Sequence, residues 1–371
     1  MAKELRSAGG QAAAAFSFFT SQKEEMAELA AKLREAAPGA VFIAGGPHAS
    51  AAPRETLGLG FDYVVRGEGE KAFPELLQAL AAGEPPPAGI IDGAPAGLAG
   101  RPPYSERYGL FGPIEITRGC PFACTYCQTS YMFGTRPRHR PLPDILRHMG
   151  VMLSRGFKEI RFITPDAFAY GSHDGKELNL PALGSFMKEA GALAEARGGK
   201  IFVGSFPSEV RPEHVLPETL ELVKKYASNR RLVMGAQTAS PRALKAIRRG
   251  HGPEEIFAAA RCCRAYKITP YMDFILGLPG ETREDEDATM DMITRLSALG
   301  AMIHTHAFMP LPGTPLAGAP AAAISRRMRE FIIRLESRGK AFGKWREQAA
   351  RYGAGAVDNN HRPKGPAQAG T

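Results

Sequence analysis

Cysteine is scarce in this chain, with five residues among 371. Three of the five are clustered in one short stretch, so they do not provide the paired framework of a disulfide-rich secreted protein. Long apolar runs are also missing, and none approaches the roughly 20 residues that a membrane-spanning helix requires. We therefore predict a protein of the reducing cytoplasm that does not span a membrane.

Charge of one sign is not concentrated in any one segment. The formal net charge is +9, but the basic residues are spread along the chain and some lie on predicted helices. A nucleic-acid partner is therefore not favoured by charge alone. With 44% hydrophobic and 23% charged residues, the composition is that of a globular protein, and the length suits one large domain and a smaller one.

Three cysteines follow a β-branched run that predicts a buried strand. The stretch Ile114–Cys127 reads IEITRGCPFACTYC, which places Cys120, Cys124 and Cys127 on the loop after that strand. Structural zinc takes four ligands, whereas three thiolates on a four-iron cluster leave one iron open to another ligand. The residues alone also allow a zinc site that includes His139, or three buried thiols.

The first part of the chain alternates strands with helices, as in a βαβ unit. Strands are predicted at 13–20, 40–45 and 63–65, and helices at 22–36, 54–59 and 72–82. Gly45 and Gly46 end the second strand, where glycine lets the backbone turn tightly or approach a ligand. The histidine that follows, His48, is predicted to lie in a loop.

A stretch with seven prolines and seven glycines, residues 83–113, predicts a linker. Beyond it the strand–helix alternation resumes, with strands at 114–117, 160–164, 201–205, 232–236, 271–276 and 302–308. The predicted domains are therefore 1–82, a linker at 83–113, a barrel at 114–315, a helical segment at 316–352 and a disordered tail at 353–371. A single amphipathic helix is expected from about 321 to 352.

These motifs resemble those of a known family. The three-cysteine loop is similar to the signature of the radical S-adenosylmethionine (SAM) superfamily, in which an aromatic residue, here Tyr126, precedes the last cysteine. The segments GGPHAS at 45–50 and FDYVVRGEGE at 61–70 resemble the cobalamin (B12)-binding domain that precedes many of these proteins. The core also resembles radical SAM methylthiotransferases, through RHRPL at 138–142, DAFAYG at 166–171 and LKAIRRGH at 244–251.

The resemblance implies an α/β fold, with a partial (β/α)6 radical SAM barrel preceded by a truncated Rossmann-like cobalamin-binding domain. The domain is expected to be truncated because the family's first strand and its D-x-H-x-x-G loop would lie upstream of Ser17. The implied cofactors are a [4Fe-4S] cluster, SAM and cobalamin. We expect cobalamin to bind weakly or not at all, without coordination of cobalt by His48.

The implied activity is reductive cleavage of SAM to a 5′-deoxyadenosyl radical, for cobalamin-linked methyl transfer or a related modification of an unknown substrate. The electron donor would be a flavodoxin- or ferredoxin-like protein. Two alternatives remain, a methylthiotransferase-like enzyme and a cluster-binding protein that has lost catalysis. Methylthiotransferases carry further cluster-binding cysteines near the front, and no cysteine precedes residue 120 here.

The resemblance also assigns side chains at the strand ends to SAM. Beside Tyr126, the candidates are Asp166, Ser205, Ser208, Glu209, Gln237, Gly277 and Pro279, while Gly45 and Gly46 are assigned to cobalamin. Each has a structural alternative, since Asp, Ser and Glu also cap turns and helices and a buried glutamine needs hydrogen-bond partners in any fold.

Three further features do not belong to these motifs. His304 and His306 alternate along the last predicted strand, so they lie on one face, either near a substrate or as core histidines bonded to the backbone. Cys262 and Cys263 are neighbours on a predicted helix and diverge, which makes them packing residues. The basic loop at 133–141 is predicted to be solvated, with anion binding as the alternative.

Overall fold

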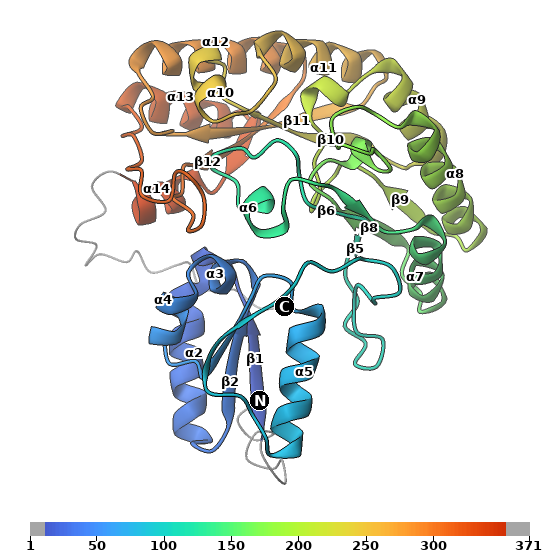
Figure 1. Ribbon diagram of the computed structural model, residues 1–371. Coiled ribbons are helices and arrows are strands. Elements are labelled where there is room, and N and C mark those ends of the chain that lie inside the picture. The colour runs from blue at the N-terminus through green and yellow to red at the C-terminus, as the bar shows by residue number, and fades with distance from the viewer. Residues whose placement is uncertain (1–11, 354–371) are drawn as a thin grey trace, which may run out of the picture.

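The computed structural model describes residues 12–353, which form a Rossmann-like domain and an open barrel that faces it (Figure 1). The predicted tail at 353–371 lies outside the described residues except for Gly353. Among residues 12–353 no helix is long and apolar enough to cross a membrane.

The first domain contains a parallel sheet in the order β1-β2-β3-β4. Its strands are β1 (Ala13–Ser17), β2 (Val41–Gly45), β3 (Tyr63–Arg66) and β4 (Gly89–Asp92), and its helices are α2 (Lys23–Ala36), α3 (Gly46–Ala51), α4 (Pro53–Gly58) and α5 (Gly69–Ala82). Strand β4 was not predicted. It lies inside the predicted linker and pairs with β3, so the linker prediction is wrong at 89–92.

Strand β1 forms one edge of the described sheet. Its buried residues, Ala14 and Phe16, join the core that includes α2, whereas Ala13, Ala15 and Ser17 on the other face are exposed. Helix α5 covers that other face over β2 and β3, through Leu76 and Leu80 packed with the core residues of those strands. The exposed strip of β1 therefore borders a cavity that is described below.

The second domain is an arc of seven parallel strands covered by helices on its outer side (Figure 1). The strands are β5 (Ile114–Glu115), β8 (Glu159–Ile163), β9 (Lys200–Phe202), β10 (Arg231–Gln237), β11 (Thr269–Leu276), β12 (Met302–Ala307) and β13 (Ala341–Gly343). Backbone bonds from Val233 N to Gly204 O (2.9 Å) and from Val210 N to Val233 O (2.9 Å) join β9 to β10. The six predicted strands are present, and β13 extends the arc.

The outer helices shield one face of every strand from water. They are α7 (Leu142–Ser154), α8 (Leu180–Ala196), α9 (Pro217–Tyr226), α10 (Pro241–Ala246), α11 (Pro253–Ala265), α12 (Arg283–Ala298) and α13 (Arg326–Ser337). Cys262 and Cys263 lie on α11 as predicted, and Cys263 is fully buried in the barrel core.

The C-terminal segment is not the single helix that was predicted. Helix α13 is followed by the strand β13 and then by α14 (Trp345–Tyr352). Gly339 adopts φ 64° after α13, a left-handed conformation that ends a helix readily. The amphipathic pattern continued across this break, so the periodicity did not reveal it.

The prediction that the basic loop at 133–141 is solvated is wrong for residues 137–140, which are buried or half-buried, whereas residues 134–136 are exposed. The loop contains β7 (Arg138–His139), which pairs antiparallel with β6 (Thr117–Arg118). Arg140 is 2% exposed, and its guanidinium donates to the backbone oxygens of Leu98, Arg101 and Glu115. The positive charges therefore hold the domain junction together.

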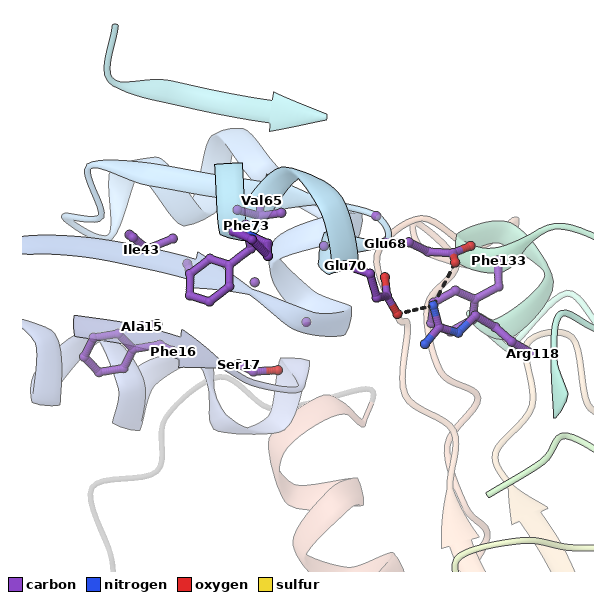
Figure 2. A pocket seen from close by; sticks show the side chains of 16 residues that line it. Ala15, Phe16, Ser17, Ile43, Val65, Glu68, Glu70, Phe73, Arg118 and Phe133 are labelled. Carbon is purple, nitrogen blue, oxygen red and sulfur yellow. Dashed lines mark hydrogen bonds and ion pairs between the residues drawn. The ribbon is translucent and has the colours of Figure 1, made fainter. Parts of the chain in front are cut away.

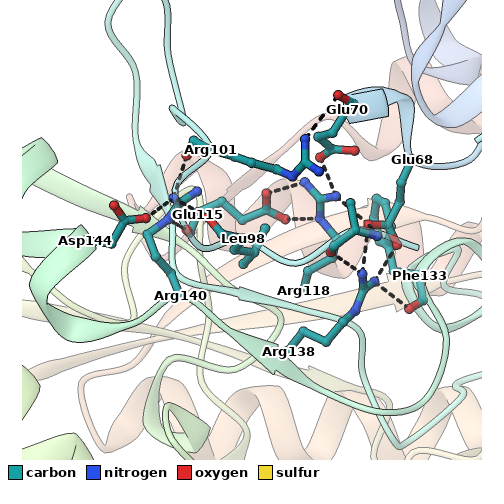
Figure 3. A network of polar contacts seen from close by, with 11 residues as sticks. Glu68, Glu70, Leu98, Arg101, Glu115, Arg118, Phe133, Arg138, Arg140 and Asp144 are labelled. Carbon is teal, nitrogen blue, oxygen red and sulfur yellow. Dashed lines mark hydrogen bonds and ion pairs between the residues drawn. The ribbon is translucent and has the colours of Figure 1, made fainter. Parts of the chain in front are cut away.

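Glu68 at the start of α5 is the centre of this junction (Figure 3). Arg118 Nη1 donates to Glu68 Oε2 over 2.7 Å, and Arg138 Nη2 donates to Glu68 Oε1 over 2.5 Å. Arg118 also pairs with Glu70 (2.5 Å) and Glu115 (2.7 Å). Burial opposes ionisation of Glu68, but Arg138 and the other donors hold its pKa below the ordinary value. The first domain and the cysteine loop are thus joined by buried ion pairs.

Candidate functional site

The cysteine loop follows β6 and is fixed by hydrogen bonds along its length. Gly119 has φ 88°, and a Cβ there would lie 2.5 Å from Arg136 O, so glycine is required. Ser130 of the short helix α6 (Thr129–Phe133) donates to Cys120 O over 2.7 Å and accepts from Ala123 N over 3.2 Å. The loop is therefore held in place before any ligand binds.

The thiols point into the mouth of the barrel. Cys124 Sγ is 3.6 Å from Arg248 O and 3.9 Å from Arg249 Nη1, both on the turn after α10. Burial raises the pKa of Cys120 to about 11 and also raises that of Cys127. A soft cation is needed to draw these thiols into the thiolate form, as metal binding does.

Zinc completed by His139 does not fit this geometry. His139 Nδ1 is 2.9 Å from Thr117 Oγ1, and its Nε2 is 2.8 Å from Ser172 O, so both ring nitrogens are engaged. Three cysteines without a fourth protein ligand fit a four-iron cluster with one open iron.

Next to the loop, three polar side chains converge over Gly235 of β10. A Cβ at Gly235 would lie 2.5 Å from Arg249 Nη2 and 2.7 Å from Glu209 Oε2, and it would also clash with Gln237 Nε2. Gln237 has φ 68° beside a register shift in β10, a backbone strain typical of ligand sites. Glu209 Oε2 is buried without a hydrogen-bond partner among the described residues. This group can accept a hydrogen bond from a ligand.

Glu209 gives a first testable prediction, because burial and then the charge of Asp273 raise its pKa to about 7. The native state therefore binds a proton more tightly than the unfolded state, in which the pKa is 4.5. The contribution of Glu209 to the free energy of unfolding should fall by about 3 kcal/mol as the pH rises from 4.5 to 7, since each pKa unit corresponds to about 1.4 kcal/mol.

Glu209→Gln should remove this fall in denaturant titrations of the cofactor-free chain. Exposed Glu189→Gln is the matched control and should keep it. Equal pH slopes in the wild type and Glu209→Gln would contradict the prediction.

Asp166 has a structural role in the described chain. Its Oδ1 accepts from Phe168 N over 3.2 Å, which caps a single 3-10 turn, and its Oδ2 pairs with His214 Nδ1. Burial opposes protonation of His214, but the Asp166 carboxylate raises its pKa above the ordinary value. Both oxygens of Asp166 are engaged, which agrees with the capping alternative, and contact with SAM would fall to the nearby backbone.

Ser205 and Ser208 are both buried on the turn after β9. Ser205 Oγ accepts from Arg161 Nη1 over 3.1 Å, and Ser208 Oγ donates to Ser205 O over 3.3 Å. Neither hydroxyl is free of local partners, so their assignment to SAM stays a prediction.

Gly277 and Pro279 form a bend after β11. Gly277 has φ 73°, its N donates to Glu281 Oε2 over 2.9 Å, and a Cβ there would lie 2.6 Å from Ala322 O. Tyr126 packs beside this bend, in the small apolar cluster that contains Leu278. The cysteine loop, Glu209, Gln237 and the bend therefore surround one space at the carboxyl ends of the strands.

A cavity of about 530 Å³ lies at the carboxyl edge of the first sheet (Figure 2). Part of its wall is backbone, because Gly45, Gly46, Gly67 and Gly69 all line it. Figure 2 places Phe73 on one side and the side chains of Arg118 and Phe133 at the end toward the barrel. The cavity therefore belongs to both domains, and its glycines and apolar walls suit a large planar cofactor.

His48 lies on α3 and not in the predicted loop. It is fully buried, and its Nδ1 is 3.2 Å from Thr20 Oγ1. Because His48 does not line the cavity, it is not placed to coordinate a cofactor there.

Several site residues were not predicted as such. Arg249 lies within the LKAIRRGH segment, and His214 and Arg211 belong to the turn before α9. The guanidinium of Arg211 stacks 3.4 Å above the ring of Phe122 on the cysteine loop. The RRGH tetrapeptide was a usable signal for Arg249, whereas the contacts of His214 and Arg211 join residues far apart in sequence.

Together, the fold and site define an α/β protein in which a Rossmann-like domain faces an open barrel with a three-cysteine loop at its mouth. The Radical SAM superfamily matches residues 114–293, and the B12 binding domain matches residues 6–77. The chain therefore contains a region that matches the radical SAM superfamily and a region that matches the B12-binding domain, and these families imply a [4Fe-4S] cluster, SAM and cobalamin as cofactors.

The chain is similar to curated proteins along part of their length. It is 27% identical over 304 residues to an uncharacterized methyltransferase of Pyrococcus horikoshii, covering 74% of this chain and 62% of the relative. It is 30% identical over 225 residues to a tRNA-2-methylthio-N(6)-dimethylallyladenosine synthase of Saccharophagus degradans, covering 59% and 46%.

The fold is also similar to solved structures. The radical SAM methyltransferase TsrM from Kitasatospora setae, with cobalamin and a [4Fe-4S] cluster bound, gives a TM-score of 0.68 at 18% identity, covering 85% of this chain and 65% of that one. The cobalamin-dependent radical enzyme OxsB, with aqua-cobalamin and SAM bound, gives 0.55 at 14% identity, covering 78% and 44%. At these identities the likeness concerns the fold.

Proposed function

We propose that this protein is a radical SAM enzyme that uses cobalamin to transfer a methyl group to a substrate still to be identified. The observation that carries the proposal is the shared cavity, because residues of the cysteine loop region, Arg118 and Phe133, form one wall of the pocket in the B12-binding domain. A corrin bound there would face the same space as the cluster. The similar fold of TsrM and OxsB, which are described as a radical SAM methyltransferase with cobalamin bound and a cobalamin-dependent radical enzyme, supports the same function.

The residues of the chain divide the work between two sites. Cys120, Cys124 and Cys127 would hold the cluster, and Tyr126, Glu209, Gln237 and the Gly277 bend would orient SAM next to it. The bound cofactors supply the radical and methyl-transfer chemistry. The protein supplies position, and it surrounds the reacting groups with buried polar side chains whose orientation is already fixed.

The proposal also implies partners. Reductive cleavage needs a low-potential electron donor, and a flavodoxin- or ferredoxin-like protein in the cytoplasm would suit an oxygen-labile cluster. A methylthiotransferase-like activity is the second candidate, supported by the 30% identity to the Saccharophagus degradans enzyme. The match of residues 6–77 to the B12 binding domain favours the cobalamin-dependent activity over it.

The decisive experiment is anaerobic reconstitution with iron, sulfide and hydroxocobalamin, followed by reduction in the presence of SAM. A cobalamin-dependent methyltransferase should release both 5′-deoxyadenosine and S-adenosylhomocysteine, and the second product should require cobalamin. Formation of 5′-deoxyadenosine alone, with no effect of cobalamin, would contradict methyl transfer. Formation of neither product would favour a cluster-binding protein that has lost catalysis.

Cobalamin binding has its own prediction. Ala15 lies on the exposed face of β1 and lines the cavity, so Ala15→Trp should fill the space and abolish retention of the corrin after desalting. Ala13→Trp is the matched control, since Ala13 is exposed on the same face but does not line the cavity. Corrin absorbance measures both. Full retention by Ala15→Trp would place the cofactor elsewhere.

A further inference from the structure

Two histidines and an aspartate meet on the inner face of the barrel. Asp273 of β11 and His304 of β12 are paired in register, and His306 follows two residues later on the same face. One ligand atom from each of the three lies within 4.8 Å of the other two. His304 Nδ1 is 3.0 Å from Asp273 Oδ1, and the two imidazole rings are 4.2 Å apart.

The inward orientation follows from the alternation along the two strands. Met272, Phe274, Ile303 and Thr305 are fully buried against the outer helices, while Asp273, His304 and His306 are only half-buried on the opposite face. The negative charge of Asp273 contributes to the raised pKa of Glu209, so the group shares the lumen with the candidate SAM site.

The two histidines are not core residues bonded to the backbone. His304 pairs with Asp273 and stacks on Phe342 of β13, with ring centroids 4.5 Å apart. His306 Nδ1 lies 3.5 Å from Gln348 Nε2. The Oε1 atom of Gln348 accepts a hydrogen bond from Ala307 N. In the part of the chain that the structure describes, neither imidazole forms a hydrogen bond with a backbone atom. The ring nitrogens therefore contact side chains only, and these side-chain contacts can give way to a ligand.

We propose that Asp273, His304 and His306 bind a divalent transition-metal ion that is separate from the cysteine cluster. Two imidazoles and one carboxylate suit zinc or iron(II), and they leave coordination positions open toward the lumen. Both imidazoles would bind the ion through an unprotonated ring nitrogen, since ligands bind metals in their deprotonated forms. Two of the three ligands are already held in position, because Phe342 stacks on the His304 ring and the strand register places Asp273 beside it.

The metal site stands without the proposed methyl transfer. A role in holding the substrate rests on that function, because the open positions face the lumen where the radical would act. Metal binding can therefore be tested on its own, and loss of the proposed function would not affect the result.

The experiment uses cobalt(II) as the probe, on the full chain with Cys120, Cys124 and Cys127 replaced by serine so that thiolates do not compete. One equivalent of cobalt should bind, with visible ligand-field bands of nitrogen and oxygen coordination, and should raise the melting temperature. His306→Gln and Asp273→Asn should each weaken binding at least about 100-fold, given that even changes to groups supporting a metal ligand cost about 10- to 100-fold.

Two controls keep the result interpretable. Exposed His173→Gln should bind cobalt like the parent, which excludes surface histidines as the source. Circular dichroism of each variant without metal should match the parent, and a variant that fails this check is replaced by His304→Gln. Unchanged cobalt affinity in folded His306→Gln, or loss of binding in His173→Gln, would overturn the proposal.

Discussion

Cys124→Ala should abolish the iron–sulfur cluster and, with it, all reductive cleavage of SAM. Cys120, Cys124 and Cys127 lie on one fixed loop, and the two other cysteines of the chain are on α11, where Cys263 is buried in the core. In the variant only two thiolates hold the four-iron cluster, so a second iron lacks a protein ligand and the cluster becomes labile. Iron content after anaerobic reconstitution should fall from about four per chain to near zero.

The matched control is Cys262→Ala, which removes a half-buried thiol outside the loop. It should keep full iron content and form 5′-deoxyadenosine at the parental rate. A full cluster in Cys124→Ala, or loss of the cluster in folded Cys262→Ala, would show that the three-cysteine assignment is wrong. Cys120→Ala and Cys127→Ala should behave like Cys124→Ala.

Glu68→Gln should loosen the two domains from each other. Glu68 is 4% exposed and accepts from both Arg118 and Arg138, so the amide removes a counter-charge from two half-buried guanidinium groups, of which Arg118 keeps Glu70 and Glu115. Breaking one partner of a buried ion pair costs about 3–5 kcal/mol. Urea denaturation followed by circular dichroism should show this loss, and protease should cut the connection at 83–113 sooner.

Asp92→Asn is the control for Glu68→Gln. It breaks the pair between Arg66 and Asp92, which lies on the surface of the same domain, and exposed pairs contribute little. Cobalamin retention should fall in Glu68→Gln but not in Asp92→Asn, because Glu68 and Arg118 line the cavity and Asp92 does not. Equal stability of the two variants would mean that the junction does not depend on Glu68.

The repeating pattern of the chain was enough to predict most of the barrel. Buried strands such as β11, with its strict alternation of buried and half-buried residues, carry a period that local sequence reveals. Strand β4 was missed because its four residues lie in a stretch rich in proline and glycine, and β13 was missed because its three residues lie inside a continuing amphipathic pattern. Their places depend on neighbours distant in sequence, as the pairing of β13 with β12 illustrates.

In the candidate site, too, features formed by residues close in sequence could be predicted, and contacts between residues far apart in sequence could not. The cysteine loop could be predicted because its three thiols are close in sequence, and spacing alone restricts their chemistry. Glu209 and Gln237 could be assigned to one site because both follow strand ends, but the approach of Arg249 over Gly235 could not, because it depends on how the turn after α10 folds onto β10. The same holds for Arg138, whose charge looked solvated until Glu68, 70 residues earlier, was found to accept its hydrogen bonds.

The first domain is also tied to the far end of the barrel. Arg351 of α14 donates to Ser21 O over 2.5 Å and pairs with Glu24 of α2. Ser21 and Arg351 are 330 residues apart, and a ribosome adds about 5–20 residues per second, so Arg351 is made roughly 15–70 s after Ser21. During synthesis the first domain can fold and pair through Glu68 well before this last contact forms. Docking across the open side of the arc is therefore among the final events in the folding of the chain.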